Sequence, residues 1–251
     1  MEERLNKWLS QMGVCSRREA ARLIEAGKVL VDNRPASMGQ KVTPGQKVVC
    51  NGKMVRVDRS QRPRPVLLAV NKPKGIVCTT TDKDRAENIV DFLGYPERIY
   101  PVGRLDKDSE GLLLMTNQGD LVNKIMRSGN AHEKEYIVTI DKPVTERFLE
   151  QMAGGIRLPE LDQVTRPCKV KKVERNTFSI ILTQGLNRQI RRMCEACGCQ
   201  VKRLVRVRIM NIRLGNLRTG AYRQITKEEY EELTGLLKDS SSLSLKERKN
   251  Q

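Results

Sequence analysis

The sequence GRLDKDSEGLLLMT, residues 103–116, places a polar turn directly before a strongly apolar run. Residues 112–115 (LLLM) are suited to a buried strand, because four consecutive large apolar residues follow the turn. Asp106 lies within the turn, where a carboxylate serves either as a turn or cap residue or as a reactive group. The stretch therefore predicts a strand whose preceding loop carries a carboxylate.

Runs with strand and helix patterns surround this stretch. We expect strands at 67–70, 136–140 and 178–182, and helices at 120–126 and 188–197. This mixture predicts one α+β domain over residues 66–237. The tail, residues 238–251, is rich in Ser and Lys and poor in apolar residues, so we expect it to be disordered.

The first 58 residues predict a separate module of two helices followed by a small sheet. Apolar residues recur with helical spacing between positions 5 and 12, and SRRE at 16–19 is a capping-box pattern that opens a second helix. A strand is expected at 29–31. Residues 59–65 (RSQRPRP) are basic and rich in proline, and are expected to link the two domains.

The charge is strongly basic and concentrated in two segments. Lysine and arginine number 47 against 30 acids, for a net charge of +17. The first 64 residues hold 14 basic and 6 acidic residues, and residues 185–213 hold eight against one. Acids are so scarce there that pairing between helical neighbours cannot neutralise the charge. We therefore expect nucleic acid as the partner, rather than a membrane surface. With one Trp, five Tyr and three Phe, folded RNA fits better than a single strand read by stacking.

Several other classes of protein are not supported. No apolar run approaches the ~20 residues of a membrane span, and the first residues, MEER, lack the apolar part of a signal peptide, so we expect a cytoplasmic protein. Seven cysteines are expected to be free thiols. Cys194, Cys197 and Cys199 lack a matching second pair, so we expect no metal. His132, the single histidine, excludes sites built on two, and no glycine-rich loop indicates a nucleotide cofactor.

Residues 4–50 resemble the S4 RNA-binding domain, through RLNKWL at 4–9, CSRREA at 15–20 and GKV at 27–29. The resemblance implies that this module positions the protein on RNA. S4 domains also occur in non-catalytic ribosome-assembly proteins and in some methyltransferases, although the glycine-rich loop of the latter is absent here. The cations of the module expected to contact RNA are Arg4, Lys7, Arg17, Arg18 and Arg22.

Four further motifs resemble, in their order, those of the RsuA-like pseudouridine synthases. They are NKPKG at 71–75, GRLDKDSEGL at 103–112, HEKEY at 132–136 and GLNRQIRRM at 185–193. The similarity covers residues 4–235. It implies a mixed-sheet catalytic domain joined to the S4 module, and the isomerisation of uridine to pseudouridine without a cofactor.

Two motifs indicate the subgroup. GNAHEKEY at 129–136 and QGLNRQ at 184–189 are most similar to the F-type enzymes of large-subunit rRNA. The resemblance therefore implies 23S rRNA as the substrate, with 16S rRNA and tRNA as alternatives, and a monomeric enzyme.

The same resemblance assigns roles to individual residues. Asp106 is the essential carboxylate. Three roles stay open for it: attack on the sugar, attack on the base, or removal of a sugar proton. Tyr136 stacks on the displaced base, unless it is only a half-buried strand residue. Arg191 pairs with Asp106, unless it is one more phosphate contact. Arg104 fills the gap left by the flipped nucleotide or contacts a phosphate. Arg188 and Arg192 are further expected RNA contacts.

Overall fold

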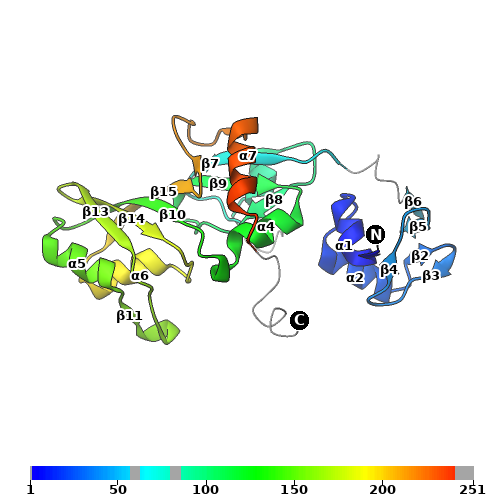
Figure 1. Cartoon of the computed structure of the whole chain (residues 1–251), viewed down its shortest axis with the longest axis horizontal. Helices are drawn as coiled ribbons and strands as arrows, with labels where there is room; N and C mark the ends of the chain where they lie inside the picture. Colours follow the sequence, from blue (N-terminus) through cyan, green and yellow to red (C-terminus); the bar gives the residue numbers. More distant parts are fainter. Residues whose placement is uncertain (1, 57–62, 80–85, 241–251) are drawn as a thin grey trace. The chain divides into compact units, whose positions relative to one another are not determined.

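The structure is a computed structural model that describes residues 2–56, 63–79 and 86–240 (Figure 1). It divides into two compact units. The first comprises Met1–Val66 with two short segments, Pro96–Arg98 and Asn117–Gly119, and the second comprises the rest of the chain. The predicted linker lies partly outside the described residues, and the predicted tail lies outside them beyond residue 240. Both therefore stay predictions.

The first unit has the predicted order of two helices followed by a sheet. Helix α1 (Leu5–Gln11) precedes α2 (Arg17–Glu25), whose first turn is capped where Ser16 Oγ accepts a hydrogen bond from the Glu19 amide at 3.1 Å. Leu5, Trp8 and Leu9 are buried against the sheet. The sheet order is β3 (Arg34–Pro35), β2 (Val29–Val31), β5 (Lys47–Cys50) and β6 (Lys53–Arg56), and β1 (Glu3–Arg4) pairs separately with β4 (Lys41–Val42).

The second unit is built on a mixed sheet, which is nine-stranded within the described residues. Its order is β13 (Lys169–Glu174), β14 (Thr177–Leu182), β10 (Lys134–Ile140), β15 (Val201–Ile209), β9 (Glu110–Thr116), β7 (Leu67–Lys72) and β17 (Tyr222–Gln224). Strand β8 (Tyr100–Val102) pairs with β9, and β16 (Ile212–Arg213) with β15. The predicted α+β class with a mixed sheet is confirmed.

The only parallel pair in the described sheet joins β15 to β9, and it is short. Val205 lies opposite Glu110, and Arg206 lies opposite Gly111. Each half of the sheet has its own hydrophobic cluster, one around Phe148, Phe178 and Met193 and the other around residues of β7 and β9. The middle of the sheet is therefore a narrow junction between two separately packed halves.

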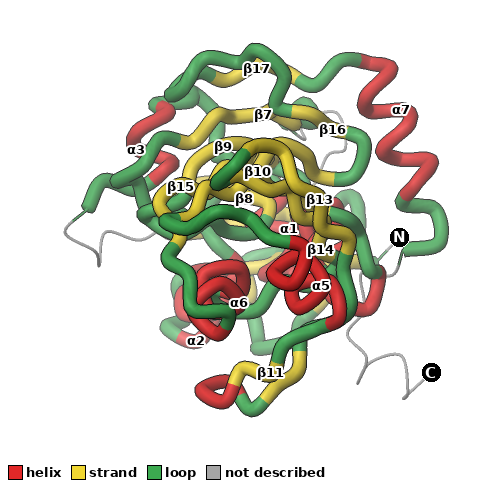
Figure 2. Tube along the Cα trace, turned by 90° about the vertical axis from the view of Figure 1, so that its left-hand side faces the viewer, coloured by secondary structure: helices red, strands yellow, loops and turns green. Residues whose placement is uncertain are grey.

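Helices cover each half. In the half with β10 and β14, α5 (Glu146–Gly154) and α6 (Gln189–Ala196) lie on one face, as Figures 1 and 2 both show. In the other half, α4 (Gly119–Met126) and α7 (Lys227–Leu236) pack on β7 and β9. The remaining short elements are α3 (Ile89–Leu93), β11 (Arg157–Leu158), β12 (Gln163–Val164) and two 3-10 turns at Ser128–Asn130 and Pro159–Leu161. None of the helices described is both long and apolar enough to span a membrane.

Candidate active site

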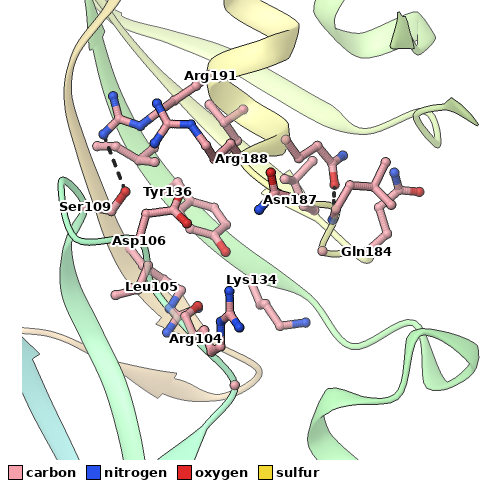
Figure 3. A pocket seen from close by; sticks show the side chains of 18 of the residues that line it. Arg104, Leu105, Asp106, Ser109, Lys134, Tyr136, Gln184, Asn187, Arg188 and Arg191 are labelled. Carbon is pink, nitrogen blue, oxygen red and sulfur yellow. Dashed lines mark hydrogen bonds between the residues drawn. The ribbon is translucent and has the colours of Figure 1, made fainter. Parts of the chain in front are cut away.

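A cavity of about 400 Å³ opens at the junction of the two halves (Figure 3). Its size suits a small ligand such as a single nucleotide base with its sugar. Asp106, Tyr136 and Arg191, the residues expected to carry the chemistry, all line it. Three segments distant in the sequence therefore converge: the loop before β9, the strand β10 and the start of α6.

A lysine of β7 binds the loop that carries Asp106. The buried Lys72 Nζ donates hydrogen bonds to the carbonyl oxygens of Pro73 at 2.7 Å and Ser109 at 2.8 Å. Burial lowers the pKa of Lys72. The Gly75 amide donates to the carbonyl of Lys107 at 2.9 Å. The NKPKG motif thus fixes the backbone around Asp106, while the Asp106 side chain itself is half-buried and faces the cavity.

Gly111 permits the close contact between β9 and β15. Its φ is +101°, and an added Cβ would lie 2.4 Å from the carbonyl oxygen of Arg206. Such a separation is well inside van der Waals contact, so a side chain here would force the strands apart. The contact between β9 and β15 therefore requires a glycine directly after the loop that carries Asp106.

The Arg191 side chain also binds the loop that carries Asp106, through contacts with Asp108 and Ser109. Its Nη2 donates to the carbonyl of Asp108 at 3.0 Å and to Ser109 Oγ at 3.5 Å, and its Nε is buried without a partner. Both residues are described, and no hydrogen bond or ion pair joins Arg191 to the Asp106 carboxylate. The direct pairing of these two side chains stays a prediction.

Tyr136 is half-buried on β10, and its ring lies beside Asp106 in Figure 3. It is opposite Arg206 in the β10–β15 ladder. The ring therefore forms one side of the cavity next to the carboxylate, where a base that enters the cavity can stack on it.

The expected RNA-binding cations differ in their surroundings. Arg104 and Arg188 are exposed on the cavity rim, with Arg188 Nη1 4.0 Å from the Asp108 carboxylate. Arg192 lies off the cavity and forms an ion pair with Glu160. In the first unit, Arg4, Arg17 and Arg18 are exposed, Lys7 is 3.5 Å from Glu3, and Arg22 is 3.3 Å from Glu19.

The basic segment 185–213 is partly neutralised in the structure. The acids that pair with it come from distant parts of the sequence and not from helical neighbours. Arg203 pairs with Glu110 at 2.5 Å, and Arg208 pairs with Glu133 at 2.9 Å and Glu135 at 2.8 Å. Part of this positive charge is therefore used within the fold, which local sequence spacing could not reveal.

Two residues of the cavity wall were missed by the sequence analysis. Lys134 and Arg206 are 6% and 2% exposed. Burial, with the adjacent Arg206 charge, lowers the pKa of Lys134 to about 8. The available signal was the position of Lys134 two residues before Tyr136, on the same face of the strand.

The cysteines near α6 behave as packed thiols. Cys194 is buried in the core beneath α6, and burial raises its pKa. Burial likewise raises the pKa of Cys168 to about 11. Within the described ranges, no group of three or more His, Cys, Asp or Glu side chains is placed to hold a metal ion.

A cavity that contains a carboxylate, in a unit that follows an S4-like module along the chain, fits an enzyme that acts on RNA. Family models agree: an RNA pseudouridylate synthase model matches residues 66–196, and an S4 domain model matches residues 3–48. The chain belongs to the RNA pseudouridine synthases, and within them to the RsuA-like branch with an S4 RNA-binding domain.

Individual relatives extend this similarity over nearly the whole chain. The dual-specificity RNA pseudouridine synthase RluF of Escherichia coli (strain K12) is 52% identical over 95% of this chain and 81% of its own length. The ribosomal large subunit pseudouridine synthase B of Bacillus subtilis (strain 168) is 36% identical over 93% and 96%. A crystal structure of a pseudouridylate synthase covers 92% of this chain and 99% of its own, at a TM-score of 0.67 and 27% identity.

Proposed function

We propose that this enzyme converts uridine to pseudouridine in 23S rRNA, with Asp106 as its catalytic carboxylate. The observation that carries the proposal is the position of Asp106 beside Tyr136 on one cavity. The name of the Bacillus relative, which refers to the large ribosomal subunit, supports the choice of rRNA. The words "dual-specificity" in the name of RluF support a second RNA substrate, for which we propose tRNA. We further propose a monomer that works in the cytoplasm.

The reaction balances without a cofactor. The N1–C1′ bond breaks, the base turns within the cavity, and C5 bonds to C1′. The C5 proton leaves to solvent and N1 takes up a proton, so there is no net oxidation or hydrolysis. Asp106 acts directly on the nucleotide, and Tyr136 stacks on the base while it turns.

The uridine reaches the cavity by leaving its stack in the RNA. Base-modifying enzymes take their target out of the helix in this way. Arg104 is exposed on the rim next to Asp106, so its guanidinium can take the place of the extruded nucleotide or bind its phosphate. Arg188, which lies across the cavity from Arg104 in Figure 3, binds a neighbouring phosphate in this proposal.

Tritium release from RNA labelled at C5 of uridine tests the proposal. We expect release from 23S rRNA with the wild-type protein and none with Asp106→Asn, whose affinity for RNA is retained. Asp108→Asn is the matched control, because this carboxylate is exposed two positions further along the same loop. Wild-type release from Asp106→Asn, or no release by the wild type on rRNA or tRNA, contradicts the proposal. Comparison of pseudouridine maps from cells with and without the gene then identifies the target uridine.

A further inference from the structure

Two buried cations lie in the cavity wall, and neither is paired with an acid of the described part of the chain. Lys134 precedes Tyr136 by two positions on β10, and Arg206 is directly opposite Tyr136 on β15. At 6% and 2% exposure, both are almost removed from water. We call Lys134 and Arg206 the cationic pair.

The hydrogen bonds of the cationic pair are incomplete. Lys134 Nζ donates to the carbonyl of His132 at a long 3.3 Å. Arg206 Nε donates to the carbonyl of Leu112 at 2.7 Å and Nη1 to that of Arg104 at 3.4 Å, but Nη2 is buried and has no partner. Among the described residues neither side chain forms an ion pair with a carboxylate. Burying like charges without an anion is costly, so the arrangement calls for an electron-rich ligand.

A register shift separates these cations from nearby acids. Tyr136 is opposite Arg206, whereas Glu135 is opposite Arg208, which leaves Val207 as an extra residue between them. Paired residues point to the same face of a sheet, so the shift places Arg206 with Tyr136 and Arg208 with Glu135 on opposite faces. Arg208 takes both Glu133 and Glu135. Glu133 and Glu135 therefore pair with Arg208 on the face away from the cavity. On the cavity side, Lys134 and Arg206 have no acidic partner among the described residues.

We propose that the cationic pair binds the detached uracil and stabilises the negative charge that it carries during the reaction. This inference rests on the proposed function of the Asp106 site. When the N1–C1′ bond breaks, its electron pair stays with the uracil and spreads over N1 and the two ring carbonyl oxygens. Arg206 Nη2 and the Lys134 ammonium donate to those oxygens. An electron pair of the uracil then forms the C5–C1′ bond; loss of the C5 proton to solvent returns the C–H pair to the ring, and N1 takes up a proton. Donors aimed at developing charge in a water-poor cavity lower the barrier strongly.

Single-turnover tritium release, measured beside RNA affinity, tests this role. For Lys134→Met and for Arg206→Met we expect the rate constant to fall about 10²-fold, in the range seen when one oxyanion donor is removed. RNA affinity should stay within about twofold, because the pair contacts the base and not the phosphates that dominate affinity. Lys171→Met is the matched control, since this lysine is exposed on β13, and it should match the wild type.

Parallel measurements separate the possible failures. Without tritium release by the wild type, the proposed function itself is wrong. If the wild type releases tritium, Asp106→Asn does not, and Lys134→Met and Arg206→Met both work at the wild-type rate, only the present inference is wrong.

Thermal unfolding distinguishes a structural lysine from a functional one. Removing an unpaired buried charge should leave the melting temperature of Lys134→Met unchanged or higher. A melting temperature that falls, together with activity restored at lower temperature, would contradict the proposal.

The pH profile gives a second check. The other titratable groups on the cavity wall are Arg104, Asp106, Tyr136, Arg188, Arg191 and Arg206, and His132 precedes Lys134 on its own segment. Because the pKa of Lys134 is about 8, the ammonium is present below that pH and lost above it. The wild-type rate should fall as pH rises through this value, and in Lys134→Arg the fall should move to higher pH. Identical profiles for the two proteins would overturn the inference.

Discussion

Lys72 illustrates how one charged residue can stabilise a loop, here the loop that carries Asp106. It is fully buried, and its ammonium donates to the carbonyl of Pro73, the next residue, and to that of Ser109 in the loop that carries Asp106. Hydrogen bonds from a charged donor to backbone are worth more than neutral ones, and their loss leaves buried carbonyls unpaired. Lys72 and Lys134 are both buried lysines of the same unit, but only Lys72 has strong hydrogen bonds within the protein.

We therefore expect Lys72→Met to destabilise the protein, in contrast with Lys134→Met. Loss of the two hydrogen bonds should lower the free energy of unfolding by about 1–3 kcal/mol, and the displaced loop should lower the rate of tritium release. Chemical denaturation checks the first effect. Lys74→Met, an exposed lysine of the same motif, is the control and should change neither quantity. Equal stability of Lys72→Met and the wild type would refute the structural role.

The second prediction concerns the close contact between strands β9 and β15. Gly111→Ala would place a Cβ against the Arg206 carbonyl at a positive φ. The clash and the backbone strain together should cost about 3 kcal/mol or more, since the carbonyl belongs to a central strand that cannot move freely. Gly154→Ala is the control, because this glycine ends α5 with open space around it. Urea unfolding of both variants measures the difference, and similar midpoints would mean that the junction adapts.

The start of helix α7 gives a pH-dependent prediction. Glu229 accepts hydrogen bonds from Arg223 at 2.6 and 2.7 Å and from the Thr226 amide at 3.0 Å, within a capping box. The Arg223 hydrogen bonds lower the pKa of Glu229 below its usual 4.5. A lowered carboxyl pKa stabilises the fold above the unfolded pKa, and that contribution disappears as pH falls through the folded value. Glu229→Gln should thus cost about 1 kcal/mol at neutral pH.

Melting temperatures from pH 7 down through the titration of Glu229 check this dependence. The gap between wild type and Glu229→Gln should close as the pH falls below 4.5. Glu231→Gln is the control, since its exposed pair with Lys227 at 3.8 Å should contribute little. A gap that persists in acid would show that the carboxylate charge is not the cause.

The sequence predicts where the helices and strands lie better than it predicts which side chains of a strand are buried. The helix at 188–197, the strands at 136–140 and 178–182 and the cap at Ser16 follow local rules, and the structure confirms them. The VKRLVRVRI pattern of β15 does not reveal that Arg206 is buried while Arg208 pairs with acids. That distinction depends on a register shift set by the neighbouring strand. The convergence of Asp106, Tyr136 and Arg191 came from motif resemblance, because no local pattern encodes contacts between distant segments.

In the whole molecule, the net charge of +17 is not equally exposed in the two units, although both contain strongly basic segments of the sequence. In the second unit, Arg192, Arg203 and Arg208 are paired with acids and Arg206 is buried. Helix α2 of the S4 unit presents Arg17, Arg18 and Arg22 on its exposed side, and Arg22 lies 3.3 Å from the Glu19 carboxylate of the same helix. Electrostatic attraction to RNA should therefore come in large part from the S4 unit, and catalysis from the second unit.

The double variant Arg18→Gln with Arg22→Gln tests this division of roles. If both cations bind phosphates, rRNA affinity should fall, and the slope of log affinity against log salt should become shallower by about 1 for each phosphate that the variant no longer binds. The single-turnover rate at saturating RNA should stay that of the wild type, because neither residue lines the cavity. The comparison variant is Lys171→Gln with Lys172→Gln, two exposed lysines on β13 of the second unit. If this variant shows an equal fall in affinity and in salt slope, the electrostatic attraction to RNA is spread over the molecule and the S4 unit is not its main source.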